Sequence, residues 1–284
     1  MSWLVWRQHR GELRILLLVL LVAGAATVWL GTAWATHAGV SPQVLAMTLL
    51  LLPFPLLPGL LIGAPLVARE AERGTLRLAW TQSQTRLGWL FAHATLVVGA
   101  LAVGVGVLQV AVTLLLFPHL AASPIGVMTF VTFDQLGVLP ACYSVFSVCL
   151  GICAGAATRR TIAAILLTLV LGAGVRVGFD AFLLPRLEPP VTTVGTVALK
   201  GPFSPTPAGS ETISWSFLDA GGHRSNQPAC LPRPKPTPCV ARYVATYQPA
   251  SRFWRFQLTE GAFYLLISAL LLGGAACLVR RRGT

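Results

Sequence analysis

The sequence contains few charged residues and almost no lysine. Charged side chains make up 11% of the chain and hydrophobic residues 55%, and the mean hydropathy is +0.73. An ordinary globular domain has roughly 25% charged residues. Lys200 and Lys235 are the only lysines. This scarcity of charge excludes an ordinary soluble domain and predicts a polytopic membrane protein.

Motifs of the common catalytic classes are also missing. Neither lysine follows a glycine, so the sequence has no Gly-x-x-x-x-Gly-Lys-Ser/Thr loop that could bind a nucleotide phosphate. It has no Gly-x-Ser-x-Gly elbow and no His-Glu-x-x-His zinc motif. We therefore expect a chain that is not an enzyme by itself and that binds no cofactor or metal of its own.

The few charges inside the apolar part of the sequence lie mostly near the ends of apolar runs. Asp134, Asp180 and Glu260 are in such positions, where solvated or paired interfacial charges are expected rather than a midplane proton relay. Arg176 lies deeper, four residues before Asp180, so the two can pair on one helix face. His93 is expected to be a packed, hydrogen-bonded histidine.

Six apolar runs are long enough to cross a hydrocarbon core of ~30 Å. They cover residues 15–35, 44–67, 89–117, 135–157, 161–182 and 260–279. The first run ends in Ala33-Trp34-Ala35, which resembles a signal-peptide cleavage site. It is longer than an h-region of roughly 7–15 residues, which favours an uncleaved anchor. Residues 1–14 are amphipathic and form either a helix in the headgroup layer or a plain basic flank.

The basic residues predict the orientation of these spans. With the N-terminus inside, the short cytoplasmic segments hold three arginines before the first span, four in residues 67–86, Arg159 and Arg160, and three at the C-terminus. The outer loops 36–43 and 118–133 contain no lysine or arginine. This asymmetry predicts six spans with both termini cytoplasmic. The predominance of arginine over lysine is typical of a GC-rich bacterial genome, so we expect the membrane to be a bacterial plasma membrane. Because the net charge of +12 falls in such clusters, nucleic acid is not an expected partner.

Prolines interrupt the second predicted span. Pro53, Pro55, Pro58 and Pro65 remove backbone donors, so the helix must kink or break. In lipid, a break of this kind persists only where protein or a water-lined cavity satisfies the freed carbonyl groups. We expect this span to pack inside the bundle or to line a pathway.

The long segment 184–257, before the last span, is predicted to form a small, partly β domain outside the membrane. Residues 191–199, 212–217 and 240–247 are β-branched or alternating enough for short strands. Cys230 and Cys239 close a short proline-rich loop in an oxidising compartment, so we expect a disulfide. A metal site is the alternative, but His223 is the only further ligand nearby.

One charged segment between the second and third spans carries a family pattern. It contains Arg69-Glu70-x-Glu72-x-Gly74-Thr75-Leu76 followed by Thr81-Gln82-Ser83-x-Thr85-Arg86-x-x-Trp89. This segment resembles the first cytoplasmic loop of ABC-2 type transporter permeases. Two further runs are similar to an actinobacterial subset of that family, Trp6-Arg7-Gln8-His9-Arg10 and Tyr247-Gln248-Pro249-Ala250-Ser251-Arg252-Phe253-Trp254.

The resemblance implies the transmembrane subunit of an ATP-binding cassette transporter. Its partners would be separate ATPase subunits, which bind ATP and Mg²⁺, and a second permease copy in a homo- or heterodimer. Residues 1–14 would form the interface helix, 15–183 the first five spans with the coupling segment 68–87, 184–257 the extracellular domain, and 258–284 the sixth span and basic tail. The large outer segment departs from the more familiar members, which have short re-entrant helices there.

The residues of the coupling segment fit an interface with an ATPase subunit. Gly74 can end the preceding helix in a left-handed conformation, and Thr75 can cap the next helix. Leu76 and Trp80 then share one helical face, which a partner's groove could accept. The surrounding charges would set the register, namely Glu70, Glu72, Arg73 and Arg77. The alternative is that Leu76 and Trp80 anchor the segment at the membrane surface.

The sequence therefore predicts an all-α polytopic membrane protein with six spans and a small extracellular insertion. The expected function is export of an amphipathic or hydrophobic substrate, driven by ATPase subunits docked on residues 70–85. A non-transporting membrane protein, such as a sensor or immunity factor that binds a ligand through its outer domain, is the alternative. An ion-coupled carrier is disfavoured because carboxylates are not expected at the midplane of the spans.

Overall fold

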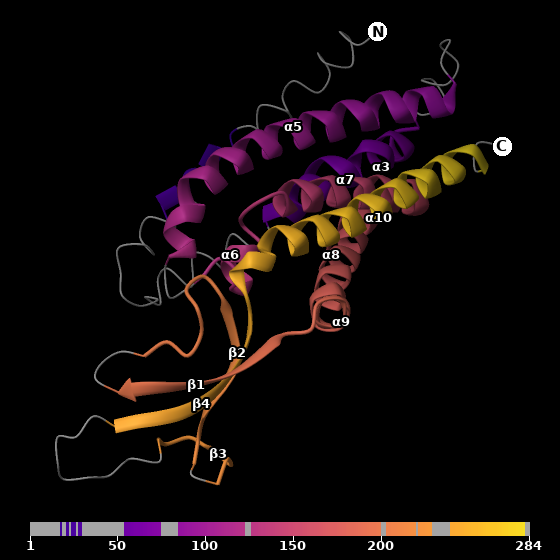
Figure 1. The fold of residues 1–284 in the computed structure, drawn as a ribbon. Helices are drawn as coiled ribbons and strands as arrows, with labels where there is room; N and C mark the ends of the chain where they lie inside the picture. Colours follow the sequence, from indigo (N-terminus) through magenta and orange to yellow (C-terminus); the bar gives the residue numbers. More distant parts are fainter. Residues whose placement is uncertain are drawn as a thin grey trace.

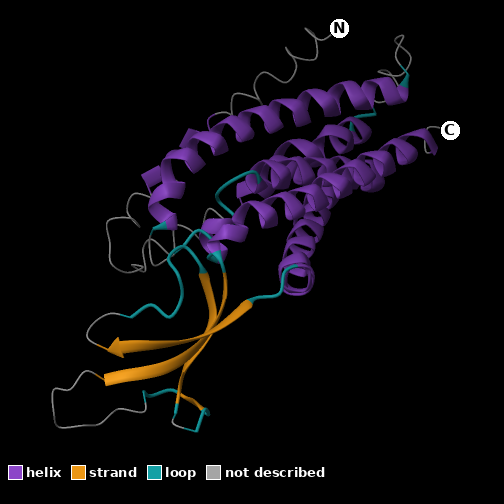
Figure 2. Cartoon of the chain, in the orientation of Figure 1, coloured by secondary structure: helices purple, strands orange, loops and turns teal. Residues whose placement is uncertain are grey.

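The computed structural model describes residues 18, 21–22, 24–26, 28–29, 54–74, 85–122, 126–199, 203–219, 221–228 and 239–281. Long helices form a bundle, and a small antiparallel sheet is attached to one end of it (Figures 1 and 2). Within the described ranges, five helical segments are long and apolar enough to cross a membrane: Phe54–Glu72, Arg86–Ala121, Leu139–Thr158, Thr161–Leu183 and Ala250–Arg281. The mostly helical membrane fold with a sheet before the last helix is thus confirmed.

The first predicted span, 15–35, is described at only a few positions, and all of them are helical. Gly24 packs against helix α5 (Arg86–Ala121), since a Cβ at this glycine would lie 2.6 Å from Leu108 Cδ1. That the chain has six spans, and how they are oriented in the membrane, stay predictions.

The proline-rich second span is broken into three pieces. A 3₁₀ turn, η1 (Phe54–Leu56), leads into a π-helical segment, η2 (Gly59–Gly63), and then into α3 (Ala64–Glu72). Ser147 of helix α7 (Leu139–Thr158) bridges the break. Its Oγ accepts from Gly59 N at 3.2 Å, and its one hydrogen is shared between Pro55 O and Ser144 O, each 2.9 Å away. In a regular helix these two backbone groups would bond to each other. The predicted protein partner for the freed carbonyl is therefore present.

Helix α7 (Leu139–Thr158) occupies the centre of the bundle, and 89% of the residues in its apolar 18-residue stretch are buried. It packs against η2, α3, α5 (Arg86–Ala121), α8 (Thr161–Gly178) and α10 (Phe253–Arg281). Small residues permit this density. A Cβ at Gly151 would lie 2.5 Å from Gly59 O, and one at Gly155 would lie 2.7 Å from Ala64 O.

Several boundaries differ from the predicted ones. Helix α5 continues through Pro118 to Ala121, because a proline in the last turn removes little of the hydrogen-bond ladder. A short helix, α6 (Phe130–Phe133), occupies part of the loop expected at 118–133. Helix α7 begins at Leu139 rather than residue 135, and α10 begins at Phe253 rather than residue 260.

Helix α8 leads through the π-helical segment η3 (Phe179–Leu183) and α9 (Leu184–Leu187) into the sheet. The strands are β1 (Val191–Leu199), β2 (Glu211–Leu218), β3 (Arg224–Ser225) and β4 (Cys239–Gln248), in the order β1-β4-β2-β3. All pairs are antiparallel, with an irregularity between Thr212 and Ser214. The three predicted strands are thus present, within one residue at each end.

Polar contacts fix the sheet to the bundle. Glu188, which follows α9, pairs with Arg255 at 2.6 Å and with Arg252 at 3.6 Å, next to the short turn η4 (Ala250–Arg252) that joins β4 to α10. On the other side, Gly209 O accepts backbone hydrogen bonds from Val127 N at 3.1 Å and Met128 N at 3.3 Å. The sheet is therefore held to both the entry of α10 and the segment before α7.

The helix ends that lie away from the sheet carry several arginines. These are the end of α3, the start of α5, the turn between α7 and α8, and the end of α10 (Figure 1). They contribute Arg69, Arg73, Arg86, Arg159, Arg160, Arg280 and Arg281. This grouping is the one that the positive-inside prediction requires of a cytoplasmic face.

Candidate functional site

The predicted ATPase-interface residues lie partly within the described chain. Glu70 and Glu72 are in the last turns of α3, Arg73 is its C-cap, and Gly74 has φ of 72°, the expected left-handed conformation. Four more predicted interface residues lie outside the described residues: Thr75, Leu76, Arg77 and Trp80.

Glu72 makes contacts that its sequence position did not predict. Its Oε1 accepts a hydrogen bond from Thr161 N at 2.9 Å, and its Oε2 accepts one from Thr161 Oγ1 at 2.7 Å. Thr161 is the first residue of α8, where backbone N–H groups have no partner within the helix and a negative charge is favourable. Glu72 thus ties the end of α3 to the start of α8.

The other predicted site residues are only partly described. Pro55, Pro58 and Pro65 lie in the broken second span, and Pro53 lies outside the described residues. Cys239 begins β4 and its backbone pairs with Leu199, but its side chain and all of Cys230 lie outside the described residues. The disulfide therefore stays a prediction.

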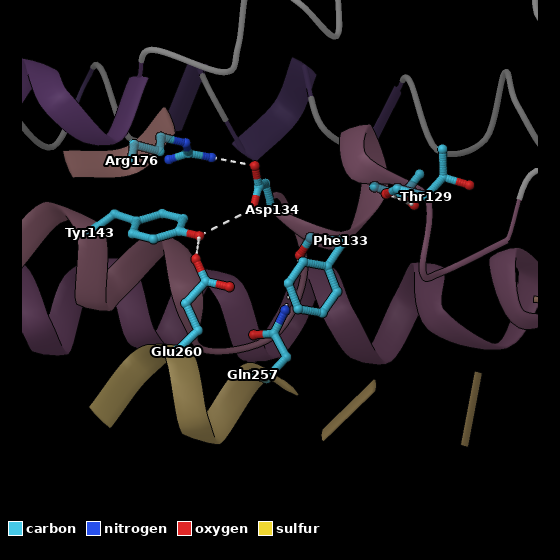
Figure 3. A network of polar contacts seen from close by, with 8 residues as sticks. Thr129, Phe133, Asp134, Tyr143, Arg176, Gln257 and Glu260 are labelled. Atoms are coloured by element: carbon cyan, nitrogen blue, oxygen red, sulfur yellow. Dashed lines mark hydrogen bonds and ion pairs between the residues drawn. The ribbon is translucent and has the colours of Figure 1, made fainter. Parts of the chain in front are cut away.

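A buried polar network lies at the sheet end of the bundle, and it joins four segments of the chain (Figure 3). Arg176 of α8 pairs with Asp134 at 2.5 Å, and its guanidinium carbon lies 4.1 Å from the centre of the Tyr143 ring. The Tyr143 hydroxyl of α7 lies 2.5 Å from Glu260 Oε1 of α10 and 3.1 Å from Asp134 Oδ1. The network links α7, α8, α10 and the segment before α7.

Gln257, one turn before Glu260, extends the network toward the segment 133–139 (Figure 3). Its Oε1 accepts from Val138 N at 3.0 Å and Leu139 N at 3.2 Å, and its Nε2 donates to Phe133 O at 2.9 Å. Thr113 Oγ1 of α5 accepts from Gly137 N at 2.8 Å. These bonds explain why α7 begins late, since the turn before it is held by side chains of α5 and α10.

The charges at the span ends were expected to be solvated or paired, and in this network the carboxyl groups are buried and have partners. Asp134 is 5% exposed and Glu260 is 1% exposed, so neither carboxyl is solvated. The ion pair of Arg176 is with Asp134, 42 residues earlier, and not with Asp180 as predicted. Burial raises the pKa of Asp134 above its ordinary value, and the Arg176 guanidinium opposes that shift.

Sequence reasoning missed the network because its members lie far apart in the chain. The available signal was the presence of Arg176 and Glu260 within apolar runs, where a charge requires a partner. The sequence does not give that partner. In contrast, His93 conforms to expectation: its Nδ1 lies 2.8 Å from Trp89 O and its side chain is buried.

The network can hold charge and transmit displacement, but it contains no nucleophile poised against a base. In the part of the chain that the structure describes, no group of three or more His, Cys, Asp and Glu side chains could hold a metal ion. Removing one partner of a buried ion pair leaves an uncompensated charge, at a cost of about 3–5 kcal/mol. The ion pair therefore holds α8 to the segment before α7, and losing either partner is costly.

The chain matches a known protein family. A family model described as ABC-2 membrane transporter related matches residues 31–183. No curated protein and no solved structure matches.

Proposed function

Since the chain belongs to the ABC-2 membrane transporter related family, we propose that it is the permease subunit of an ATP-binding cassette exporter in a bacterial plasma membrane. Separate ATPase subunits dock on residues 70–85, and a second permease copy completes the pathway. The observation that carries this proposal is the family match over residues 31–183, which includes the whole docking segment.

The packing of α3 supports a coupling role for the segment that follows it. Glu72 ties the end of α3 to Thr161 at the start of α8. Behind this tie, the backbones of α3 and α7 approach so closely that a Cβ at Gly155 would lie 2.7 Å from Ala64 O. Densely packed elements move as units rather than deform continuously. A displacement of residues 70–85 would thus reach α7 and α8 through α3.

The cargo that we propose is amphipathic or hydrophobic. The described spans present apolar side chains over most of their surfaces, including Val107, Leu114, Leu166 and Leu270, each more than half exposed. Buried charge is concentrated in the network at the sheet end. A panel of lipids and amphipathic compounds, added to the assembled complex, should contain a stimulator of ATP hydrolysis.

The docking proposal can be tested by purification with the ATPase. The chain is co-expressed with ATP-binding cassette ATPase subunits from the same genome, and the complex is purified on this chain. We expect Trp80→Ala to weaken binding by roughly 30-fold in Kd, since truncating a buried tryptophan anchor costs about 2 kcal/mol or more. Trp254→Ala is the matched control, because Trp254 is exposed at the sheet end of α10, away from the docking segment.

The outcome separates the candidate functions. Equal ATPase binding by the Trp80→Ala and Trp254→Ala variants would show that residue 80 faces lipid and not the partner. Failure of any ATPase subunit to co-purify with the wild-type chain would favour the alternative of a non-transporting sensor or immunity protein.

A further inference from the structure

The hydrogen bonds of Tyr143 require more protons than the tyrosine can supply. Its hydroxyl oxygen lies within hydrogen-bond distance of both Glu260 Oε1, at 2.5 Å, and Asp134 Oδ1, at 3.1 Å. A phenol carries one hydrogen, and an ionised carboxylate can only accept. Both contacts are hydrogen bonds only if one of the two carboxyl groups carries its own proton.

The partners of the two carboxyl groups indicate which one is protonated. Asp134 pairs with the Arg176 guanidinium, which favours the ionised form. Glu260 has no cation in hydrogen-bond contact among the described residues, and its Oε2 has no hydrogen-bond partner there. With the side chain 1% exposed, an ionised Glu260 would leave a charged oxygen buried and unpaired. A neutral carboxyl group avoids that cost.

The surroundings of Glu260 make a second negative charge unfavourable. Asp134 and Asp180 both act electrostatically against a negative charge on Glu260, and Arg176, which is already paired with Asp134, acts in its favour. The titratable and charged groups that face Glu260 are Cys142 and Tyr143 of α7, Asp134 of the segment before α7, Arg176 of α8, Asp180 of η3 and Tyr264 of α10 itself. The Tyr264 hydroxyl is buried and also has no hydrogen-bond partner in the described chain. Glu260 Oε2 and the Tyr264 hydroxyl are therefore two buried polar atoms of this region without a hydrogen-bond partner among the described residues.

We infer that Glu260, Tyr143 and Asp134 form a proton-binding site, with the proton held on Glu260. Glu260 donates to the Tyr143 oxygen, Tyr143 donates to Asp134, and Asp134 is balanced by Arg176. Release of the proton to a base in solution leaves a carboxylate on Glu260 and adds one negative charge beside Asp134. No step requires ATP, so the inference stands apart from the exporter assignment.

Proton release has a structural consequence because Glu260 lies in the helix that carries the sheet. The new charge repels Asp134 across the Tyr143 hydroxyl, and the contact between α10 and α7 weakens. Helix α10 follows β4 after only a short turn, and Gln257 attaches the same part of α10 to the segment 133–139. Loss of the proton therefore loosens residues 250–260, the junction between sheet and bundle.

Infrared spectroscopy of the full chain in lipid nanodiscs tests the protonation state directly. A protonated carboxylic acid has a carbonyl stretch separate from that of a carboxylate, and the chain has only nine Asp and Glu residues. We expect an acid band in the wild type near neutral pH that is lost as the pH rises. The band should shift when Glu is labelled with carbon-13 and stay in place when Asp is labelled. Absence of the band, or a shift on Asp labelling alone, would overturn the inference.

Three variants assign the band to the site. Glu260→Gln should remove it completely, and Tyr143→Phe should move it to higher frequency because the acid loses its acceptor. Asp219→Asn, in the exposed turn between β2 and β3, should leave it unchanged. A band that survives Glu260→Gln contradicts the assignment. The labelling of the wild type decides the question if that variant fails to fold.

Hydrogen exchange tests the mechanical consequence. In the wild type, exchange at residues 250–260 should accelerate over the same pH interval in which the acid band is lost. Glu260→Gln keeps a neutral side chain at every pH, so its exchange at these residues should show no such step. Exchange that stays constant while the band disappears would overturn the link between proton release and the loosening of α10.

Discussion

Replacing Ser147 by alanine should destabilise the bundle, because the serine hydroxyl hydrogen-bonds both sides of the break in the second span. The Ser147 hydroxyl is fully buried and occupies the position between Gly59 N and Pro55 O, groups that would bond to each other in a regular helix. Alanine removes the bridge and leaves the buried Gly59 N–H and the partly buried Pro55 C=O without this partner.

The size of the effect follows from these two contacts. The net contribution of a hydrogen bond to stability is roughly 0.5–1.5 kcal/mol. Side-chain hydrogen bonds between transmembrane helices average about 0.6 kcal/mol, with a maximum near 1.7 kcal/mol. We therefore expect Ser147→Ala to cost about 1–2 kcal/mol, which is a roughly 5- to 30-fold fall in the ratio of folded to unfolded protein.

Ser144→Ala provides the matched control. Ser144 is on the same helix and is also buried, but its Oγ donates only to Pro140 O, four residues earlier in α7. Such a bond adds little to a carbonyl that already belongs to the helix ladder, so the loss should be under about 0.5 kcal/mol.

The assay is equilibrium unfolding of the full chain in mixed micelles, with helix content followed by circular dichroism. The reasoning would be refuted if Ser147→Ala cost no more than Ser144→Ala. That result would mean that Gly59 N and Pro55 O close onto each other once the serine is gone.

Two further predictions concern packing and orientation. Gly151→Ala should lower stability by about 1–3 kcal/mol in the same unfolding assay, because its Cβ would lie 2.5 Å from Gly59 O and 2.6 Å from Ala64 N. Gly106→Ala, with nothing within 4 Å of its Cβ, should be neutral or stabilising, and an equal loss for both would disprove the close-packing argument. A cysteine at position 82 should react with a membrane-impermeant reagent in inside-out vesicles and not in intact cells, relative to the wild type. Labelling of that cysteine in intact cells would contradict the cytoplasmic placement of residues 67–86.

The sequence predicted the parts of the fold that depend on local pattern. Apolar runs located the helices now found in α5, α7, α8 and α10, and alternation located β1, β2 and β4 within one residue. The boundaries were less accurate where side chains from elsewhere decide them. Helix α7 begins at Leu139 because Gln257 and Thr113 hold the preceding turn, and those residues are distant in the chain.

For the candidate sites too, the sequence predicted what a local motif carries and missed what depends on distant residues. The Glu-x-Gly-Thr pattern at Glu72, Gly74 and Thr75 gave the family, which the match over residues 31–183 confirms. The pattern did not give the bond from Glu72 to Thr161, because nothing in a linear motif indicates which distant helix begins beside it.

By itself, the sequence determined that the chain is a helical membrane protein, where its strands lie, and which family it belongs to. These properties follow from hydropathy, residue alternation and a contiguous motif, all of which act over short distances along the chain. Only the tertiary structure decided that Arg176 pairs with Asp134 and that Glu260 contacts Tyr143. A buried ionisable group requires a partner close in space, and in this bundle the partners are separated by up to 117 positions along the chain, from Tyr143 to Glu260.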